Sequence, residues 1–366
     1  MRQGLWAVIV IALVHSAAAL VGASLRAPTP TPLMPAASGA LETLGVQFHR
    51  VGASRFLPVY GELLAALDPD TTVQVVVADD EDEAMFMAAW EDWFPDGDGP
   101  ALRFAHTDRP ITSWMRDRLA VLRDADDTIL LAPRRPMEGP RTRSHDWTVP
   151  WTLGDALDLT VRVPDFHFEG GDLIADDERI YIAAPLLGRN PSMTSAEVVA
   201  AVEVATGMDA LLLDGRVPNH HIGMFVTPLG DGRVAVGDPD LALSVWDPGE
   251  APMVGGLPLP LDRSEARLER FRNVIDQLED AGVEVVRLPL LPATQDYVFL
   301  SYNNVMLETR DDGALHVYLP IYGVPLDDAA IDVWTQQGAV VHPIDVTSIF
   351  RLGGSVRCLT APIARR

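Results

Sequence analysis

The sequence predicts an α/β fold built from a repeated unit, in which a β-hairpin is followed by a helix and a short strand. Three observations support this prediction: four hairpin patterns, segments of helical spacing between them, and hairpin starts that recur about every 50 to 80 residues. A repeat of this length is typical of a propeller or a solenoid. Residues 40–366 have room for five units without a break in composition, so we expect one domain of five ββαβ units.

Each predicted hairpin consists of two apolar runs separated by a turn rich in Asp or Gly, residues that favour the backbone conformations of tight turns. In the third hairpin, for example, the apolar runs 224–226 and 234–236 flank Gly230, Asp231 and Gly232. The four hairpins are expected over residues 119–131, 173–182, 224–236 and 305–318.

Segments with apolar residues at helical spacing lie between the hairpins and near the start of the chain, and a short apolar run follows each of them. The helices are expected over residues 61–67, 80–94, 196–206, 267–281 and 327–337. The strands that follow are expected over residues 73–77, 102–104, 210–213, 283–286 and 339–341. The order of hairpin, helix and strand therefore recurs along the chain.

The first 23 residues have the pattern of a signal peptide: Arg2, an apolar run over 5–14 and small residues over 16–23. We expect cleavage near Ser24 and export to the periplasm or the medium. An uncleaved anchor is the alternative, because residues 5–23 approach the roughly 20 residues that span a bilayer, although His15 weakens it. Residues 24–39 are rich in Pro and Ala and predict an extended linker before a catalytic domain over 40–366.

The chain is strongly acidic, with 52 Asp and Glu against 28 Lys and Arg and a formal charge of −24. This charge disfavours binding to nucleic acid and favours cationic ligands. The sequence contains a single cysteine, Cys358, so no disulfide can form within the chain. Cys358 is therefore either a buried apolar residue or a free thiol with a function.

Polar clusters precede the first strand of each predicted hairpin, at residues 114–117, 169–172, 220–223 and 302–304. If the repeats surround an axis, equivalent positions lie at the same end of it. The last repeat ends in 353–360, which brings the thiol to the same ring. The repeat pattern thus predicts one opening lined by Asp117, Glu169, Asp172, His221 and Cys358.

These residue types suit covalent attack on an amidine carbon. A cysteine attacks as the thiolate, which positive charge stabilises, and Arg357 and the glycine pair before it are candidates to supply that field. A histidine moves protons to the leaving amine and from water, while paired carboxylate oxygens match a planar guanidinium. An ordinary thiol protease has no use for a pocket lined with carboxylates.

Each residue taken alone has a simpler interpretation. Asp117 is then a helix cap or a solvated charge, the segment 169–172 a glycine turn, and His221 a histidine at the edge of the core. Asn303 and Asn304 have the character of turn formers. Matching positions in independent repeats are harder to explain in this way, so the combination favours a site.

Four motifs resemble those of the arginine deiminase and amidinotransferase superfamily. Trp114-Met115-Arg116-Asp117 resembles the Trp-x-Arg-Asp segment of agmatine deiminases and, more loosely, a stretch of peptidylarginine deiminases. The segment 168–172, followed by Gly188-Arg189-Asn190, resembles a stretch of arginine deiminases and dimethylarginine hydrolases. His221-Ile222-Gly223 resembles a His-x-Asp segment, and 353–360 is similar to the C-terminal Gly-Gly-x-Arg-Cys-x-Ser/Thr motif of arginine deiminases.

The resemblance implies the pentein fold, a propeller of five ββαβ units with pseudo-fivefold symmetry, and a reaction without metal or organic cofactor. It implies that Cys358 forms a covalent amidino intermediate, that His221 transfers protons, and that Asp117 and Glu169 hold the guanidinium. From the same motifs we expect substrate contacts from Trp114, Arg116, Asp172, Arg189, Asn303 and Arg357.

The chain departs from the family pattern at Gly223, where the His-x-Asp motif has a carboxylate. We expect a hydrolase acting on arginine, agmatine, a methylated arginine or peptidyl-arginine. Asp172, Asp214 and Asp238 are candidates to replace the missing acid. The alternatives are an amidinotransferase that uses the same cysteine and an inactive pentein that binds a cationic ligand or a protein. The sequence does not indicate an oligomeric state.

Overall fold

The computed structural model describes residues 31–124, 127–134, 143–247, 249 and 251–366. The predicted signal peptide and most of the predicted linker lie outside the described residues, as do two residues of the first predicted turn. No helix within the described ranges is long and apolar enough to cross a bilayer.

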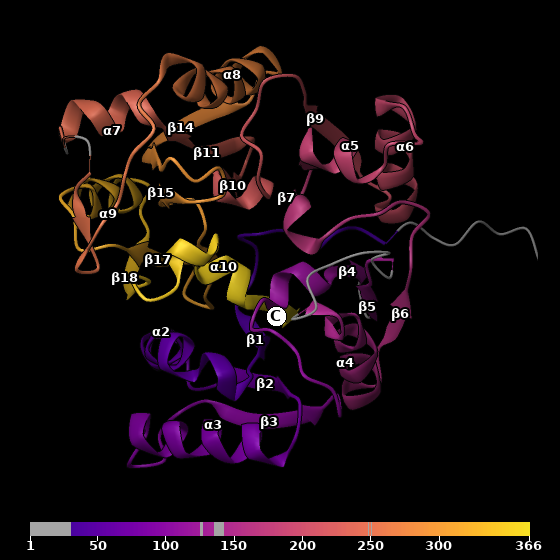
Figure 1. Ribbon diagram of the computed structural model, residues 1–366. Coiled ribbons are helices and arrows are strands. Elements are labelled where there is room, and N and C mark those ends of the chain that lie inside the picture. The colour runs from indigo at the N-terminus through magenta and orange to yellow at the C-terminus, as the bar shows by residue number, and fades with distance from the viewer. Residues whose placement is uncertain (1–30, 125–126, 135–142, 248, 250) are drawn as a thin grey trace, which may run out of the picture.

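The described chain forms five sheets of three or four strands and one small two-stranded sheet. In each of the five, two antiparallel strands are followed by a strand parallel to the second. Figure 1 shows these sheets around a common centre, in the order in which they occur along the chain. The strands are β19 (Thr360–Arg365), β1 (Leu41–Gln47), β2 (Thr72–Val77) and β3 (Ala101–His106); β4 (Ala120–Asp124), β5 (Asp127–Leu131) and β6 (Thr160–Arg162); β7 (Ile174–Ala175), β8 (Arg179–Ala183) and β9 (Asp209–Leu213); β10 (Val226–Gly230), β11 (Arg233–Asp238), β14 (Glu284–Pro292) and β15 (Phe299–Ser301); β16 (Met306–Thr309), β17 (Leu315–Ile321) and β18 (Val340–Asp345); and the pair β12 (Met253–Val254) and β13 (Leu257–Pro258).

The four predicted hairpins are confirmed by the pairs β4–β5, β7–β8, β10–β11 and β16–β17. Their turns use residues suited to left-handed backbone: Gly230, Asp231 and Gly232 all have positive φ angles between β10 and β11. A parallel third strand requires a longer crossover than a hairpin turn, and a helix supplies it in each repeat.

The predicted helices over 80–94, 196–206, 267–281 and 327–337 are confirmed within two residues, and 61–67 corresponds to the second half of a longer helix. Local signals account for several ends: Asp79 caps α3, while Thr194 and Gly207 begin and end α6. The helices are α2 (Ala53–Ala65), α3 (Asp80–Trp93), α4 (Val149–Leu157), α5 (Pro185–Arg189), α6 (Ser195–Thr206), α7 (Pro239–Val245), α8 (Glu265–Asp280), α9 (Leu326–Gln336) and α10 (Val356–Leu359).

The hydrophobic core lies between the sheets and the helices outside them (Figure 1). Large aromatic side chains from the helices are fully buried there, including Tyr60 of α2, Phe271 of α8 and Trp334 of α9. Burial of such side chains supplies most of the stabilisation that holds a helix on a sheet.

The fifth antiparallel pair joins the two ends of the described chain. Strand β19 pairs with β1, with Leu41 opposite Arg365 and Val46 opposite Thr360. The sequence pattern revealed only four hairpins because the strands of this pair are separated by almost the whole chain. The pairing fixes α10, which directly precedes β19, at the centre of the molecule.

Residues 31–39 pack on the body of the protein, contrary to the expected free linker. Leu33 is buried and forms a bridge with Leu122, and the Met34 N–H donates to the Val121 carbonyl at 2.8 Å. Arg365 donates to the carbonyls of Ala36, Ser38 and Gly39. The predicted boundary at residue 40 therefore falls within chain that belongs to the packed structure.

A single helical turn precedes the first strand in four of the five repeats: η2 (Met115–Arg118), η5 (Gly170–Asp172), η6 (Ile222–Met224) and α10. These turns contact one another in the pairs η2–α10, η2–η5 and η5–η6. The approach of η5 to η2 is close, because a Cβ at Gly170 would overlap the carbonyl oxygens of Arg116 and Leu119.

Replacement of Gly170 by Ala tests this packing. The added methyl group meets backbone atoms, which cannot move aside cheaply, so we expect the free energy of unfolding to fall by about 2 to 3 kcal/mol. Urea unfolding followed by circular dichroism measures the change. Gly188→Ala is the matched control, because its Cβ has no neighbour within 4 Å; it should leave the stability unchanged or raise it slightly. Equal effects of the two substitutions would contradict the packing argument.

Candidate active site

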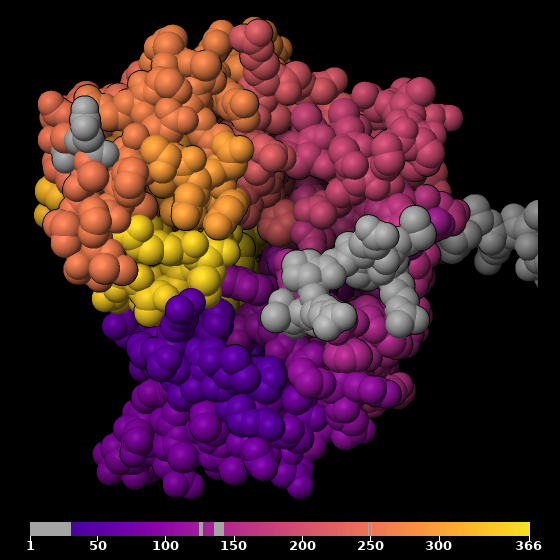
Figure 2. All heavy atoms as spheres, in the orientation of Figure 1, coloured from indigo at the N-terminus to yellow at the C-terminus, as the bar shows by residue number. Residues whose placement is uncertain are grey.

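A cavity of about 280 Å³ opens where the helical turns meet. In Figure 2, segments coloured from indigo to yellow come together around the middle of the visible face, so widely separated parts of the chain meet there. The lining residues are Trp114, Asp117, Arg143, Glu169, Pro185, Arg189, Asn219, His220, His221, Tyr297, Leu352, Gly353 and Cys358.

Cys358 lies in α10 and is only 4% exposed, yet it lines this polar cavity. Its backbone N–H donates to Asn304 Oδ1 at 3.3 Å, and the Arg357 N–H donates to the Asn304 carbonyl at 3.0 Å. The preceding glycines are required by the local geometry: Gly353 has a φ of +86°, and a Cβ at Gly354 would overlap the Trp114 ring. The motif around the cysteine thus holds the thiol at the cavity wall.

His221 is the histidine that interacts with both the thiol and the carboxylates. Its Nε2 lies 2.9 Å from Glu169 Oε2, and its Nδ1 lies 3.6 Å from Asp117 Oδ1. Burial opposes protonation, but the Asp117 charge and interactions with the side chains of Cys358 and Glu169 raise the pKa of His221 well above its ordinary value. The imidazole is therefore the protonated form at neutral pH.

The neighbouring His220 has the opposite character. Burial, together with the charge of His221, lowers the pKa of His220 to about 3, so this ring stays neutral. Its Nδ1 accepts the His221 N–H at 2.7 Å, which leaves the proton on Nε2 to donate to the Gly353 carbonyl at 2.8 Å. His220 therefore ties the backbone of His221 to the loop before Cys358.

Glu169 begins η5 and points into the cavity, and Asp172 holds its backbone from behind. The Asp172 carboxylate accepts the Glu169 N–H at 2.7 Å and pairs with Arg189 Nε at 2.7 Å. Burial opposes ionisation of Glu169, yet the hydrogen bond from His221 and the nearby Arg189 and Arg143 charges lower the pKa of Glu169 to about 2. Glu169 is therefore a carboxylate throughout the neutral range.

Arginines of the chain itself pair with the cavity carboxylates. Arg143 hydrogen-bonds Asp117 Oδ2, while the other Asp117 oxygen is buried without a hydrogen-bond donor in the described chain. Arg189 Nη2 donates to Glu169 Oε2 at 2.6 Å. Arg118 and Arg143 also lie within 3.6 Å of the buried Asp146, which anchors them from behind. Sequence reasoning missed Arg143 and Asp146, because neither belongs to a recurring motif.

The predicted substrate contacts fall into two groups. Trp114 and Arg189 line the cavity, and Asp172 lies behind Glu169, almost fully buried. The other three do not line it: Arg116 and Arg357 face a second cavity, and Asn303 is buried, with its amide donating to Ala235 O at 3.0 Å. Asn304, expected as a turn former, instead positions the backbone of Cys358.

Gly223 does not leave a gap in the cavity wall. A Cβ at this position would lie 2.7 Å from Arg357 Nε, so its side-chain direction is toward Arg357. Two of the suggested replacements for the missing acid act elsewhere: Asp214 bonds the Gly215 N–H and Asp238 caps α7. Of the three candidates only Asp172 approaches His221, at 3.9 Å.

Within the described ranges, no group of three or more His, Cys, Asp or Glu side chains is arranged to hold a metal ion. The assembled groups instead comprise a thiol, a protonated imidazole and two carboxylates. This set provides a nucleophile, a proton donor and acceptors for a planar cation.

Several solved structures share the fold. Agmatine deiminase from C. jejuni superposes with a TM-score of 0.69 at 15% identity, covering 91% of this chain and 96% of that chain. Agmatine deiminase from Enterococcus faecalis gives 0.66 at 15% identity, covering 93% and 99%. A putative arginine deiminase from Porphyromonas gingivalis gives 0.64 at 16% identity, covering 90% and 97%.

No protein with a curated description matches the chain in sequence. A family model does match, over residues 49–363, which include every motif of the cavity. The model describes the Porphyromonas-type peptidyl-arginine deiminases, and this chain belongs to that family of deiminases.

Proposed function

We propose that the chain is a cysteine-dependent deiminase that hydrolyses the guanidinium group of an arginine side chain. One observation carries the proposal: a thiol, a protonated imidazole and two carboxylates from separate repeats line a single cavity, namely Cys358, His221, Asp117 and Glu169. In this proposal the five sheets are the blades of a pentein propeller, and the cavity lies at one end of its axis.

In the first half of the reaction, Asp117 and Glu169 hold the planar guanidinium. The Cys358 sulfur attacks the central carbon and forms a C–S bond. His221 donates its proton to the leaving nitrogen, the C–N bond breaks, and ammonia departs. The protonated state of His221 supports this role, because it provides the proton and stabilises an adjacent thiolate.

In the second half, water attacks the same carbon and gives a proton to His221. The C–S bond then breaks, and its electron pair returns to sulfur. The product is a ureido group, which for an arginine residue is citrulline. His221 ends the cycle protonated, as it began, so no further reactant is needed.

The surroundings of the cavity favour an arginine within a polypeptide over agmatine. A groove of about 640 Å³ adjoins the cavity and shares Trp114 and Leu352 with it. Its walls include Val51, which is 86% exposed, and Phe56, and such an apolar surface suits neighbouring residues of a peptide. The charge of Arg189 at the cavity would repel the terminal ammonium of agmatine and attract a carbonyl oxygen.

In the same proposal the enzyme acts outside the cytoplasm, because residues 1–23 have the composition of a signal peptide. A polypeptide substrate and a chain without disulfides are both compatible with that location. Detection of a mature N-terminus near Ser24 in a periplasmic or culture fraction would support export.

The activity is tested with an arginine-containing peptide, free arginine, agmatine and a methylated arginine. We expect ammonia and a ureido product from the peptide, at the highest kcat/KM of the four. Cys358→Ser should reduce kcat by at least about a thousandfold, because the covalent intermediate cannot form. Selective labelling of the wild-type thiol by a haloacetamidine provides an independent readout. Absence of both turnover and labelling would refute the hydrolase.

The protonation of His221 is tested by NMR titration of histidine side chains in isotope-labelled protein. Since neighbouring carboxylates raise the pKa of His221, its imidazolium should persist above pH 6.5 and be lost only at higher pH. Glu169→Gln removes one of these carboxylates and should move the titration midpoint down by about one pH unit. Glu91→Gln, at an exposed position of α3, should leave it unchanged. A wild-type midpoint at or below 6.5 would contradict this account.

A second candidate is a binding protein without turnover, favoured by the pairing of Arg143 with Asp117. In the deiminase, Arg143 must leave this carboxylate when substrate binds. Arg143→Gln should then lower KM by roughly three- to tenfold with kcat little changed, because the competing cation is gone. Arg134→Gln, at a solvent-exposed ion pair, is the control.

The two candidates give different results with this variant. A binding protein would gain affinity for a guanidino ligand, measured by calorimetry, and still form no product. An increase in KM would show instead that Arg143 helps to bind the substrate.

A further inference from the structure

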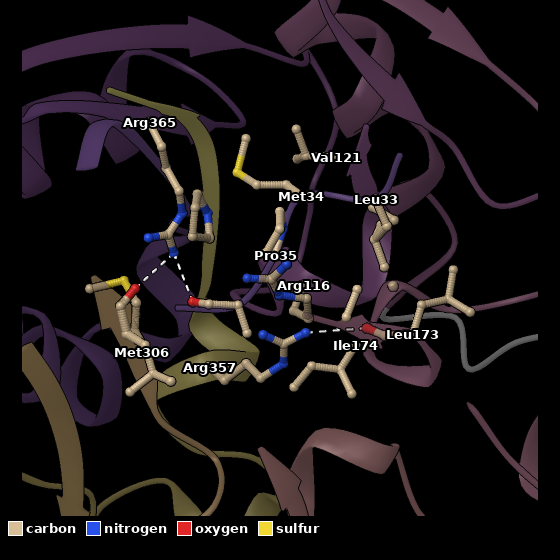
Figure 3. A pocket seen from close by; sticks show the side chains of 16 residues that line it. Leu33, Met34, Pro35, Arg116, Val121, Leu173, Ile174, Met306, Arg357 and Arg365 are labelled. Carbon is tan, nitrogen blue, oxygen red and sulfur yellow. Dashed lines mark hydrogen bonds between the residues drawn. The ribbon is translucent and has the colours of Figure 1, made fainter. Parts of the chain in front are cut away.

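We propose that the protein binds a small inorganic anion in a second cavity, lined by Arg116, Arg357 and Arg365. This cavity has a volume of about 30 Å³ and is separate from the catalytic one. Figure 3 shows the three arginines around it, with Met34 and Pro35 of the N-terminal segment beside them.

The helical turns that carry the catalytic groups also form this second cavity. Asp117 and Cys358 line the catalytic cavity, whereas the residue before each of them, Arg116 or Arg357, lines the second one. Arg365 reaches it from β19. The site therefore does not depend on the proposed function, and it stands or falls separately.

The three guanidinium groups are almost completely removed from solvent, with Arg116 8%, Arg357 9% and Arg365 3% exposed. Across the described residues, no carboxylate lies within ion-pair distance of any of them. The acids that act on them from farther away are engaged elsewhere: Asp117 pairs with Arg143, and Glu308 pairs with Arg310 and Tyr318. Three positive charges thus share one enclosed space without a counter-charge.

Their hydrogen-bonding capacity is also incompletely used. Arg365 donates to four backbone carbonyls, including Leu307 O at 2.7 Å, but Arg357 donates only to Leu173 O, at 3.2 Å. Arg116 makes no hydrogen bond within the described chain, and the Nε atoms of all three arginines are buried without an acceptor. Donors therefore remain available toward the cavity.

Electrostatics favours an anion between these groups. Burial lowers the pKa of Arg357 and Arg365 to about 10, and burial with the charges of those two neighbours lowers the pKa of Arg116 further. Burying an uncompensated ion costs several kcal/mol, and an arginine does not escape this cost by releasing its proton. One bound anion would offset three repulsive contacts and accept hydrogen bonds from the free donors.

The size of the cavity limits the occupant. A volume of about 30 Å³ holds one or two water-sized groups, which suits a halide or a comparably small inorganic anion. An organic carboxylate such as gluconate is too large to enter. Chloride is the obvious test ligand, and gluconate is the matching non-binding anion.

Thermal unfolding in sodium chloride and in sodium gluconate of equal ionic strength tests the site. We expect chloride to raise the Tm of the wild type by about 2 to 5 °C, since it binds only the folded chain. Arg116→Met should abolish this response, whatever its effect on the Tm itself. Arg103→Met, at an exposed position of β3, should retain it. An equal Tm of the wild type in both salts, or a full chloride response in Arg116→Met, would overturn the proposal.

Crystals of the wild-type protein grown in sodium bromide give a direct readout that requires no variant. Anomalous scattering should reveal bromide between the three guanidinium groups. Bromide peaks confined to the surface, with water or no density in the cavity, would overturn the proposal. Phosphate at equal ionic strength serves as a further arm: displacement of bromide would identify an oxyanion as the preferred occupant within the same class.

Discussion

The close packing of the helical turns at the centre of the molecule is the constraint on which the site depends. These turns approach so closely that glycine is required at their contacts: a Cβ at Gly170 would overlap the backbone of η2, and one at Gly171 would lie 2.5 Å from the His221 ring. Because each turn is held by the first strand of its repeat, the packing fixes Cys358, His221 and Glu169 relative to one another. Preorganisation of this kind is what a covalent mechanism needs from its scaffold.

Charge is treated differently in the two cavities that this packing creates. In the catalytic cavity, Asp117 and Glu169 are balanced by Arg143, Arg189 and the imidazolium of His221, so a guanidinium must exchange with cations already present. In the second cavity, positive charge has no acidic partner. Neighbouring residues in the same turn face these two environments, and the polarity of each side chain therefore decides which cavity it lines.

The ends of the chain contribute to both features. Strand β19 carries the residues directly after Cys358 into a sheet with β1, and Arg365 on that strand holds the carbonyls of residues 36–39. Disruption of this pairing would release α10 and with it the thiol. The catalytic cysteine is thus positioned by long-range pairing as well as by the glycines of its own motif.

The sequence by itself determined the hairpins, most of the helices and the meeting of Asp117, Glu169, His221 and Cys358. These follow from turn residues, from helical periodicity and from the equivalence of positions in a repeat, all of which are local or recurring signals. Only the tertiary structure decided that Asn304 holds the cysteine backbone, that Arg143 covers Asp117 and that Arg116 and Arg357 turn away from the catalytic cavity. The physical reason is that the partner of each of these side chains lies far away in the sequence, and the direction of a side chain on a single helical turn is set by what packs around it.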